Sequence, residues 1–510
     1  MYPDQLAPAS SARPLRTSLE RVAQITDRVP GAIVHVLPPY VAEEDDRFAV
    51  IDDSSIDPRL GKWCDLGFNG APIALDFIVN QRSRASVEFR RFAAQEPLYR
   101  RFFYEIPESF DFAHCHTPRG RMPMTIAETA TGEKNLWSAH GGQQVDLNYG
   151  AGEVVAWALE RLAILARRAA WVRIDGVAFA WKRSGTSCAN LPEARALCAL
   201  LSHMWRSLRP DGGVIAEVDR YGPETSYIDG SVGPDVTYDY ALPGCVAAAV
   251  ACGDTVPLSR HVEELAGRAS CAWLNLAVTH DGISLRPWAP AAPVESLRDV
   301  IARATENGLH VEHRRRAGGT EPYEIDAFPA DLARRGEARA SVVTLANVVL
   351  LTLRGAPLLY IPAVLGECAQ RSAVEPRDAV RGRIRGSALP RPTEEAAVGS
   401  PVRLMALRTS EPALAASAPM RLTYNDSGLL VYERGQEGVV TVALNFSRNV
   451  RPFSMRQSGY ELITGARAAG VVAIAPRCAK VFLHAGSAWY GGDKPHSGRG
   501  GTSVVRSPER

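Results

Sequence analysis

The sequence predicts an α/β protein built on a (β/α)8 TIM barrel, with a short inserted B subdomain and a C-terminal antiparallel β domain. Apolar runs of strand length alternate with segments of helical period from about residue 33 to residue 361, as in a mostly parallel sheet covered by helices. This alternation stops near Ala406, where apolar runs of β type follow one another without helices. The 510 residues also exceed one compact core, so two domains are expected.

The barrel elements can be placed in order along the chain. Strand-like apolar runs occupy residues 33–37, 73–79, 171–174, 214–216, 274–278 and 358–361. Segments with helical period occupy residues 153–168, 192–205, 294–306 and 341–353. In the first of these, Val155, Leu159 and Leu162 recur on one face, and Asn307-Gly308 is a stop signal for the third.

The composition changes along the chain predict the domain organisation. Residues 105–144 are polar and rich in Pro, Gly and Thr, which is too long a stretch for a simple loop and favours an inserted subdomain. We therefore expect barrel residues at 1–104, a B subdomain at 105–150, the rest of the barrel at 151–404 and a β domain at 405–490. The Gly, Ser and Arg-rich segment 491–510 is expected to be a disordered tail.

Charge and cysteine usage exclude several classes of function. The formal charge of +2 argues against a nucleic-acid or membrane surface as the partner, and the sequence does not determine the oligomeric state. There is no apolar run of membrane-spanning length and no signal-peptide pattern at the N-terminus, so we expect a cytoplasmic protein. The nine scattered cysteines indicate reduced thiols rather than a disulfide framework or a zinc site.

Carboxylates follow three of the predicted strands, where a barrel places its chemistry. Arg173 and Asp175 are two apart on one strand, so they project to the same face, and the guanidinium is expected to keep Asp175 ionised as a nucleophile. Glu217 follows the next strand and could hold its proton in a dry cleft as a general acid. Asp281 follows a third strand. Two such carboxyl groups flanking a glycosidic bond give a retaining double displacement, with the third available to stabilise positive charge.

Each carboxylate has a simpler interpretation when it is taken alone. An isolated Asp or Glu after a strand is more often a helix cap or a solvated loop charge. His114-Cys115-His116 could bind a metal, but alternating ligands with no further cluster are a poor match to known spacings, so we expect no metal site. The basic run at residues 313–316 is expected to be a solvated face on a loop.

The ordered set of motifs resembles the conserved regions of the α-amylase superfamily (glycoside hydrolase family 13). The four regions are Asp76-Phe-Ile-Val-Asn80, Arg173-Ile-Asp175, Ala216-Glu217 and His280-Asp281. Further segments resemble its sucrose phosphorylase and glucosylglycerate phosphorylase branch: Phe48-Ala-Val-Ile-Asp52, Asp57-Pro-Arg-Leu-Gly61, Gln144-Val-Asp-Leu-Asn148, Trp181-Lys182, Gly185-Thr186, His280-Asp-Gly-Ile283, Arg286-Pro287, Pro322-Tyr-Glu-Ile325 and Gly355-Ala-Pro357. The resemblance spans about residues 2–446.

This resemblance implies roles for individual residues. It makes Asp175 the nucleophile, Glu217 the acid/base and Asp281 the transition-state stabiliser. Substrate-binding residues implied by the motifs are Asp45, Asp76, Asn80, Gln81, Arg173 and His280. Arg119 falls where the branch has a basic residue near the acceptor or phosphate, and an arginine fork suits phosphate oxygens, although a solvated loop arginine is an equal alternative. No cofactor is implied, with inorganic phosphate as co-substrate.

The chain also departs from the family pattern. The first region ends Asn80-Gln81 where the family has Asn-His, so an imidazole that contacts the sugar is replaced. Arg47 stands where a glycine is usual and could narrow the pocket. Glu375 interrupts a motif that carries a sugar-binding arginine, for which Arg377 could substitute. Residues 2–5 resemble the segment that follows the first barrel strand in relatives, so that strand is expected upstream of Met1, with an open barrel as the alternative.

Three functions are compatible with these residues. The leading one is a retaining phosphorylase that moves an α-glucosyl unit between a small glucoside, such as sucrose or glucosylglycerate, and phosphate. The second is a hydrolase or transglucosylase of the same fold, in which water or a sugar replaces phosphate. The third is a catalytically impaired relative that binds sugar, which Gln81, Arg47 and Glu375 would favour.

Overall fold

The structure is a computed structural model of the chain. It describes residues 1–43, 47–67, 70–141, 143–219, 227, 233–285, 294–316, 318–371, 373, 376–384, 401–426, 428–462 and 465–485. The predicted tail at residues 491–510 lies outside the described residues. Among the helices that are described, none combines the length and the apolarity needed to cross a bilayer.

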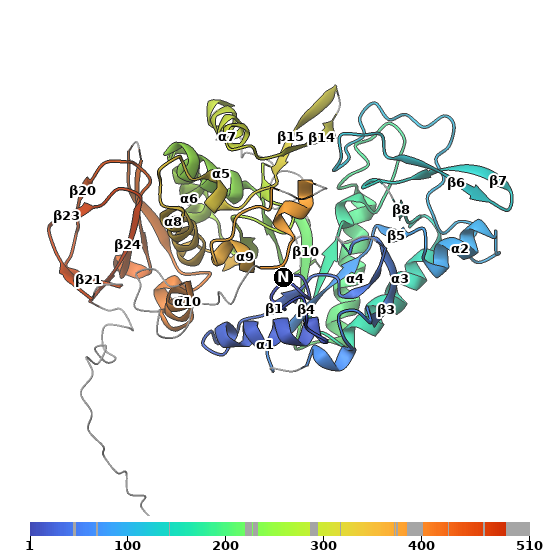
Figure 1. Ribbon diagram of the computed structural model, residues 1–510, viewed down its shortest axis with the longest axis horizontal. Helices are drawn as coiled ribbons and strands as arrows, with labels where there is room; N and C mark the ends of the chain where they lie inside the picture. Colours follow the sequence, from blue (N-terminus) through green and yellow to red (C-terminus); the bar gives the residue numbers. More distant parts are fainter. Residues whose placement is uncertain are drawn as a thin grey trace, which may run out of the picture.

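A curled sheet of seven parallel strands forms the centre of the molecule (Figure 1). In spatial order its strands are β1 (Val34–Val36), β4 (Ile73–Ile78), β9 (Trp171–Asp175), β10 (Gly213–Asp219), β11 (Val236–Asp239), β12 (Trp273–Asn275) and β16 (Ala356–Pro357). The spatial order equals the sequence order, as a (β/α) barrel requires. No strand of this sheet precedes β1 among the described residues, and Met1 lies beside β1, where its amino group donates to the carbonyl of His35 (2.8 Å).

Helices cover the outside of this sheet. They are α1 (Pro14–Thr26), α2 (Val87–Ala93), α3 (Gly152–Ala166), α4 (Pro192–Leu208), α5 (Ala241–Cys252), α6 (Val256–Gly267), α7 (Val294–Glu306), α8 (Arg339–Thr352), α9 (Ile361–Val364) and α10 (Pro401–Ser410). Helix α4 begins with a proline at its first turn, where no hydrogen bond is lost, and buries one apolar face. Helix α5 is apolar on all sides and almost entirely buried, so it packs as a core element.

Part of the second half of the barrel differs from what the sequence predicted. Strand β11 and helix α5 were not predicted. Helix α5 has no polar face, so its sequence shows no helical period. The last strand was also predicted too late in the chain, since β16 is Ala356–Pro357 and Ile361 begins α9. The basic run at residues 313–316 is not a loop but part of a strand, β14 (Val311–Arg316).

Four small antiparallel sheets lie around the carboxyl ends of the barrel strands. Strand β14 pairs with β15 (Gly319–Ile325), which also pairs with β13 (Ile283–Ser284). The hairpin of β6 (Met124–Thr129) and β7 (Gly132–Trp137) projects at the right of Figure 1, and β8 (Gln144–Asp146) returns to pair with β5 (Gln81–Ser83). Strands β2 (Tyr40–Ala42) and β3 (Val50–Ile56) form a further pair. Residues 105–150 remain our proposed B subdomain.

A separate antiparallel sheet follows α10 and lies at the left of Figure 1. Its strands, in spatial order, are β17 (Met420–Asp426), β18 (Leu429–Arg434), β19 (Val440–Asn445), β24 (Cys478–His484), β21 (Gly459–Glu461) and β22 (Arg467–Ala468), with β20 (Arg451–Ser454) and β23 (Val471–Ile474) as a second pair. Arg408 of α10 donates to the carbonyls of Leu351 (2.8 Å) and Leu353 (2.9 Å) at the end of α8. A cation there satisfies carbonyls that the helix leaves unpaired.

Candidate active site

One pocket lies at the carboxyl ends of the barrel strands and encloses about 590 Å³, its solvent mouth included. It brings together residues from nine separated segments of the chain. The lining residues are Phe48, Gln81, Pro118, Arg119, His140, Gln144, Arg173, Asp175, Gly176, Phe179, Glu217, His280, Asp281, Tyr323, Glu324 and Arg381. All three carboxylates that the sequence singled out as catalytic therefore face the same cavity.

Arg173 is the buried centre of the charged cluster. Its Nη1 lies 2.5 Å from Asp175 Oδ1 and 2.5 Å from Asp76 Oδ1, and its Nε donates to the hydroxyl of Tyr238 (2.9 Å). Asp76 and Arg173 are cross-strand partners on β4 and β9, which fixes this contact. Asp76 is fully buried and does not line the pocket. Asp76 therefore holds Arg173 through their ion pair and does not itself reach the cavity.

Asp175 differs in its ionisation from what the sequence suggested. Burial raises the pKa of Asp175 to about 8, against the opposing charge of Arg173, and the neighbouring carboxylates of Glu217, Asp76 and Asp281 raise it further. Burial also disfavours the charge of Asp76, but His35 and Arg173 hold the pKa of Asp76 well below its usual range. One guanidinium thus serves two carboxylates. The direction of the pKa shift of Asp175 is opposite to the expectation that Arg173 keeps Asp175 ionised near neutral pH, because burial of Asp175 outweighs the attraction of Arg173.

Glu217 is held by two donors. The hydroxyl of Tyr240 donates to Oε1 at 2.6 Å, and the backbone N–H of Gly176 donates to Oε2 at 3.2 Å. Gly176 follows Asp175 directly and has a φ of +65°, which is unfavourable for other residues. A Cβ atom there would lie 2.3 Å from Asn80 Oδ1. Asn80 is fully buried beneath this turn and does not line the pocket.

Asp281 is paired with an arginine that the sequence analysis did not identify. Arg381 Nη2 lies 2.9 Å from Asp281 Oδ1, and Arg381 Nε donates to the carbonyl of His280 (3.1 Å). The imidazole of His280 stacks on Phe48 with a 5.0 Å centroid separation, and burial lowers its pKa to about 3, so the ring is neutral. The only signal for Arg381 in the sequence is a run of arginines after residue 370, which the family motif did not resolve.

Gln81 and Arg119 both line the pocket. Gln81 is buried, and its side-chain amide contacts His140 and also Gln144 of β8, the strand that pairs with β5. Arg119 lies on the rim of the pocket, and its Nη1 is 3.9 Å from Glu312 Oε2. Thr117, two residues earlier, forms a β-bridge with Arg315 of β14.

Other residues from the sequence analysis lie elsewhere. Asp45 and Glu375 are outside the described residues, as is the side chain of Arg377. Arg47 does not narrow the pocket: its guanidinium turns away and donates to the carbonyls of Pro38 (2.8 Å) and Tyr40 (2.7 Å) and to Asp57 (2.8 Å). Arg47 does adopt the left-handed conformation, with a φ of +67°, which explains why glycine suits this position.

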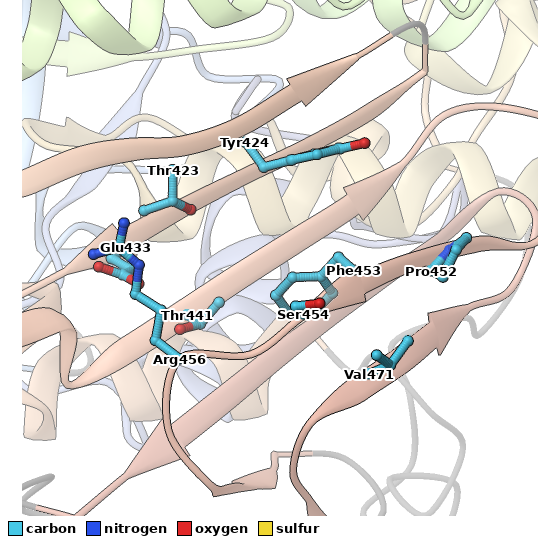
Figure 2. Close-up of a pocket in the computed structure, with 9 residues that line it drawn as sticks. All are labelled: Thr423, Tyr424, Glu433, Thr441, Pro452, Phe453, Ser454, Arg456 and Val471. Carbon is cyan, nitrogen blue, oxygen red and sulfur yellow. The ribbon is translucent and has the colours of Figure 1, made fainter.

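A second hollow lies on the C-terminal sheet and encloses about 870 Å³, open solvent included (Figure 2). Its described lining contains one carboxylate, Glu433, which pairs with Arg421 at 2.5 Å and approaches Arg456 at 4.0 Å. This lining has no second carboxylate for acid/base work, so the barrel pocket is the candidate active site. Among the described residues no group of three or more His, Cys, Asp or Glu side chains is arranged to hold a metal ion.

Comparison with known proteins finds relatives that match most of the chain. No family model matches it. The glucosylglycerate phosphorylase of Allomeiothermus silvanus is 29% identical over 495 residues, which span 92% of this chain and 88% of the relative. The glucosylglycerate phosphorylase of Escherichia coli is 30% identical over 356 residues, 67% of this chain and 63% of the relative. This chain is a homologue of glucosylglycerate phosphorylases.

A solved structure supports the same assignment of the fold. The crystal structure of sucrose 6F-phosphate phosphorylase from Thermoanaerobacter thermosaccharolyticum superposes with a TM-score of 0.74 at 19% identity, and the match covers 95% of this chain and 97% of that one. The fold of that phosphorylase therefore extends over nearly the whole chain, the C-terminal sheet included. The pocket at the carboxyl ends of the strands contains the three predicted catalytic carboxylates and also Gln81, one of the departures from the family pattern.

Proposed function

We propose that this protein is a retaining phosphorylase that transfers a glucosyl unit between a small glucoside, sucrose-like or glucosylglycerate-like, and inorganic phosphate. The observation that carries the proposal is the convergence of Asp175, Glu217 and Asp281 on one pocket that also contains Arg119 and Arg381. Three carboxylates suit glycosyl transfer, and guanidinium groups suit phosphate oxygens. The relatives named glucosylglycerate phosphorylase support the same reaction class.

The proposed reaction uses two displacements. An ionised Asp175 attacks the anomeric carbon, while Glu217 gives its proton to the oxygen of the leaving group. The resulting glucosyl ester on Asp175 is then attacked by a phosphate oxygen, and Glu217 takes up the phosphate proton, which releases glucose 1-phosphate and restores both groups. Asp281 stabilises the positive charge that develops on the sugar in the transition state of each displacement, and Arg381 holds that carboxylate in place at 2.9 Å.

The raised pKa of Asp175 fits this cycle only if substrate binding or higher pH removes its proton. A nucleophile must be ionised, and burial raises the pKa of Asp175 to about 8. A carboxyl group with this pKa loses its proton close to physiological pH, so a small change in its surroundings is enough to activate it.

The remaining assignments are part of the same proposal. Arg173 and His280 would support the nucleophile and the sugar, Gln81 would contribute to the sugar subsite, and Arg119 would bind phosphate from the rim. Asp76 and Asn80 would act from beneath the pocket, and Asp45, outside the described residues, would bind glucosyl hydroxyls. The reaction needs no cofactor. We propose action in the cytoplasm on small molecules, without nucleic acid or membrane as a partner, which the balanced formal charge of +2 favours.

The test is the release of glucose 1-phosphate from a panel of α-glucosides that includes sucrose and glucosylglycerate, with and without phosphate. We expect phosphate-dependent release that the Asp175→Asn variant loses. Release of free glucose regardless of phosphate would favour the hydrolase or transglucosylase alternative instead. No turnover of any glucoside by folded protein would favour the impaired sugar-binding alternative.

A further inference from the structure

Gln81 cannot replace the imidazole that the family pattern places at its position, because its amide is already used within the protein. Its Nε2 donates to Gln144 Oε1 at 2.5 Å and faces the carbonyl of Phe48 at 3.5 Å. Its Oε1 accepts from Asn80 Nδ2 at 3.2 Å. Since a carbonyl only accepts, the contact with Phe48 identifies the nitrogen end of the amide. The side chain is also buried, with 2% of the residue exposed.

An imidazole nevertheless lines the pocket directly beside Gln81. His140 lines the cavity, and its Nδ1 lies 2.8 Å from Gln81 Oε1. Because this oxygen can only accept, Nδ1 must carry the hydrogen. In the neutral ring the other nitrogen, Nε2, is then an acceptor, as a hydrogen bond from a sugar hydroxyl requires. The edge of the His140 ring also meets Phe179, with a centroid distance of 6.0 Å and an interplanar angle of 90°.

Hydrogen bonds hold the two residues that precede His140, Ser138 and Ala139. Their segment connects β7 to β8, and the N–H of Ser138 donates to the carbonyl of Pro123 (3.0 Å), while its hydroxyl donates to the carbonyl of Gln144 (2.7 Å). The next N–H, that of Ala139, donates to Asp146 Oδ1 at 2.9 Å. Backbone contacts at the two residues before His140 therefore set the direction from which its ring enters the pocket.

We propose that His140 supplies the imidazole that contacts the bound glucosyl unit, and that Gln81 is a positioning residue that fixes the tautomer and orientation of this ring. The inference rests on the proposed function. The two positions have exchanged roles: the amide at residue 81 holds the ring at residue 140, and the ring contacts the sugar. The change from His to Gln at position 81 is then compatible with turnover and does not indicate a lost activity.

The first test compares His140→Ala with His203→Ala, which removes an exposed histidine on α4 far from the pocket in sequence and fold. We expect kcat/KM for glucose 1-phosphate release to fall by about 100-fold in His140→Ala, the usual effect of losing one positioned group at the reacting sugar. His203→Ala should match the parent protein. Equal activity of the two variants, with both folded, would overturn the inference while leaving the phosphorylase proposal intact.

The second test addresses Gln81 as a positioning residue. With ¹⁵N-labelled histidine, the resonances that disappear in His140→Ala identify this ring, and we expect the Nδ1–H tautomer in the parent protein. In Gln81→Ala the tautomer preference should be lost, and Gln81→Glu, which keeps an acceptor at the same place, should restore it. An Nδ1–H signal that persists in Gln81→Ala would overturn the positioning role, since a merely structural glutamine would leave the ring unchanged.

A binding measurement keeps the inference testable if the parent protein turns over no glucoside. Deoxynojirimycin, a glucose-configured imino sugar, is titrated calorimetrically into the parent protein, His140→Ala and His203→Ala. Weaker binding by about tenfold or more in His140→Ala alone would support the sugar contact even without catalysis, whereas equal binding by all three proteins would overturn it. The binding measurement thus tests the contact between His140 and the sugar independently of the proposed phosphorolysis.

Discussion

Arg381 Nη2 lies 2.9 Å from Asp281 Oδ1, although 100 positions separate the two residues in the sequence. The guanidinium is 9% exposed and also donates to the carbonyl of His280, so it clamps the turn that carries Asp281. This contact supplies an arginine at the pocket where the family motif, interrupted at Glu375, had suggested a loss.

Removal of this clamp should impair catalysis. We expect Arg381→Ala to lower kcat for glucose 1-phosphate release by about 100-fold, because Asp281 loses the cation that holds it beside the sugar. Arg383→Ala is a matched control, since Arg383 is 43% exposed and pairs with Asp4 away from the pocket. Such exposed pairs contribute little. Similar rates for the two variants would show that Arg381 has no part in the reaction.

The pH profile of turnover should reflect the buried state of Asp175. The pKa of this group is raised to about 8 by burial, so the reactive anion is scarce below that pH and increases through it. We expect the ascending limb of kcat/KM against pH to have its midpoint near 8, in contrast to the usual value of about 4 for aspartate. A midpoint near 4 would mean that Arg173 keeps Asp175 ionised after all.

The same shift affects stability. A carboxyl group whose pKa is higher in the folded than in the unfolded protein favours folding below about pH 4. This contribution is lost as the pH rises towards 8, because the unfolded chain releases the proton first. Asp175→Asn removes the ionisable group. We compare the free energy of unfolding of this variant with that of the parent at each pH. The difference, variant minus parent, should be larger at pH 9 than at pH 5 by at least about 1 kcal/mol. A constant difference, measured by urea denaturation, would contradict the raised pKa.

The turn after Asp175 should not tolerate a side chain. Gly176→Ala adds a Cβ atom 2.3 Å from Asn80 Oδ1 and also strains a φ of +65°. Gly31→Ala is the control, because Gly31 has a φ of +77° and open space at the Cβ position. We expect Gly31→Ala to cost about 1 kcal/mol of unfolding free energy from backbone strain and Gly176→Ala to cost about 2 kcal/mol more from the clash. Equal costs in urea denaturation would exclude the clash.

Replacement of Arg119 should weaken the binding of phosphate more than the binding of the sugar. We expect Arg119→Ala to raise KM for phosphate by about tenfold, because a guanidinium contact to an anion on the pocket rim is lost. Any phosphate-independent hydrolysis should stay within about twofold of the parent rate. Arg100→Ala, at an exposed position outside the pocket lining, serves as the control. A change in hydrolysis as large as the change in phosphorolysis would assign Arg119 to the sugar instead.

Local patterns in the sequence were enough to predict the barrel and the strand ends that carry the candidate catalytic residues. The alternation of strands and helices predicted the barrel, and the strand periodicity placed Arg173 and Asp175 on one face. The carboxyl ends of parallel strands meet on the same side, so Asp175, Glu217 and Asp281 were expected together, and all three line one pocket. Their catalytic roles stay predictions. Strand β11 and helix α5 were missed because a fully buried helix carries no amphipathic period.

The sequence by itself determined the fold class, the resemblance to phosphorylases and the three carboxylates, because each depends on short-range periodicity or on residues a few positions apart. Only the tertiary structure decided which distant groups meet. Arg381 reaches Asp281 from 100 positions away, and His140 meets Gln81 from 59 positions away. It also decided the ionisation of Asp175, because a pKa depends on burial and on the charges that surround the group in space.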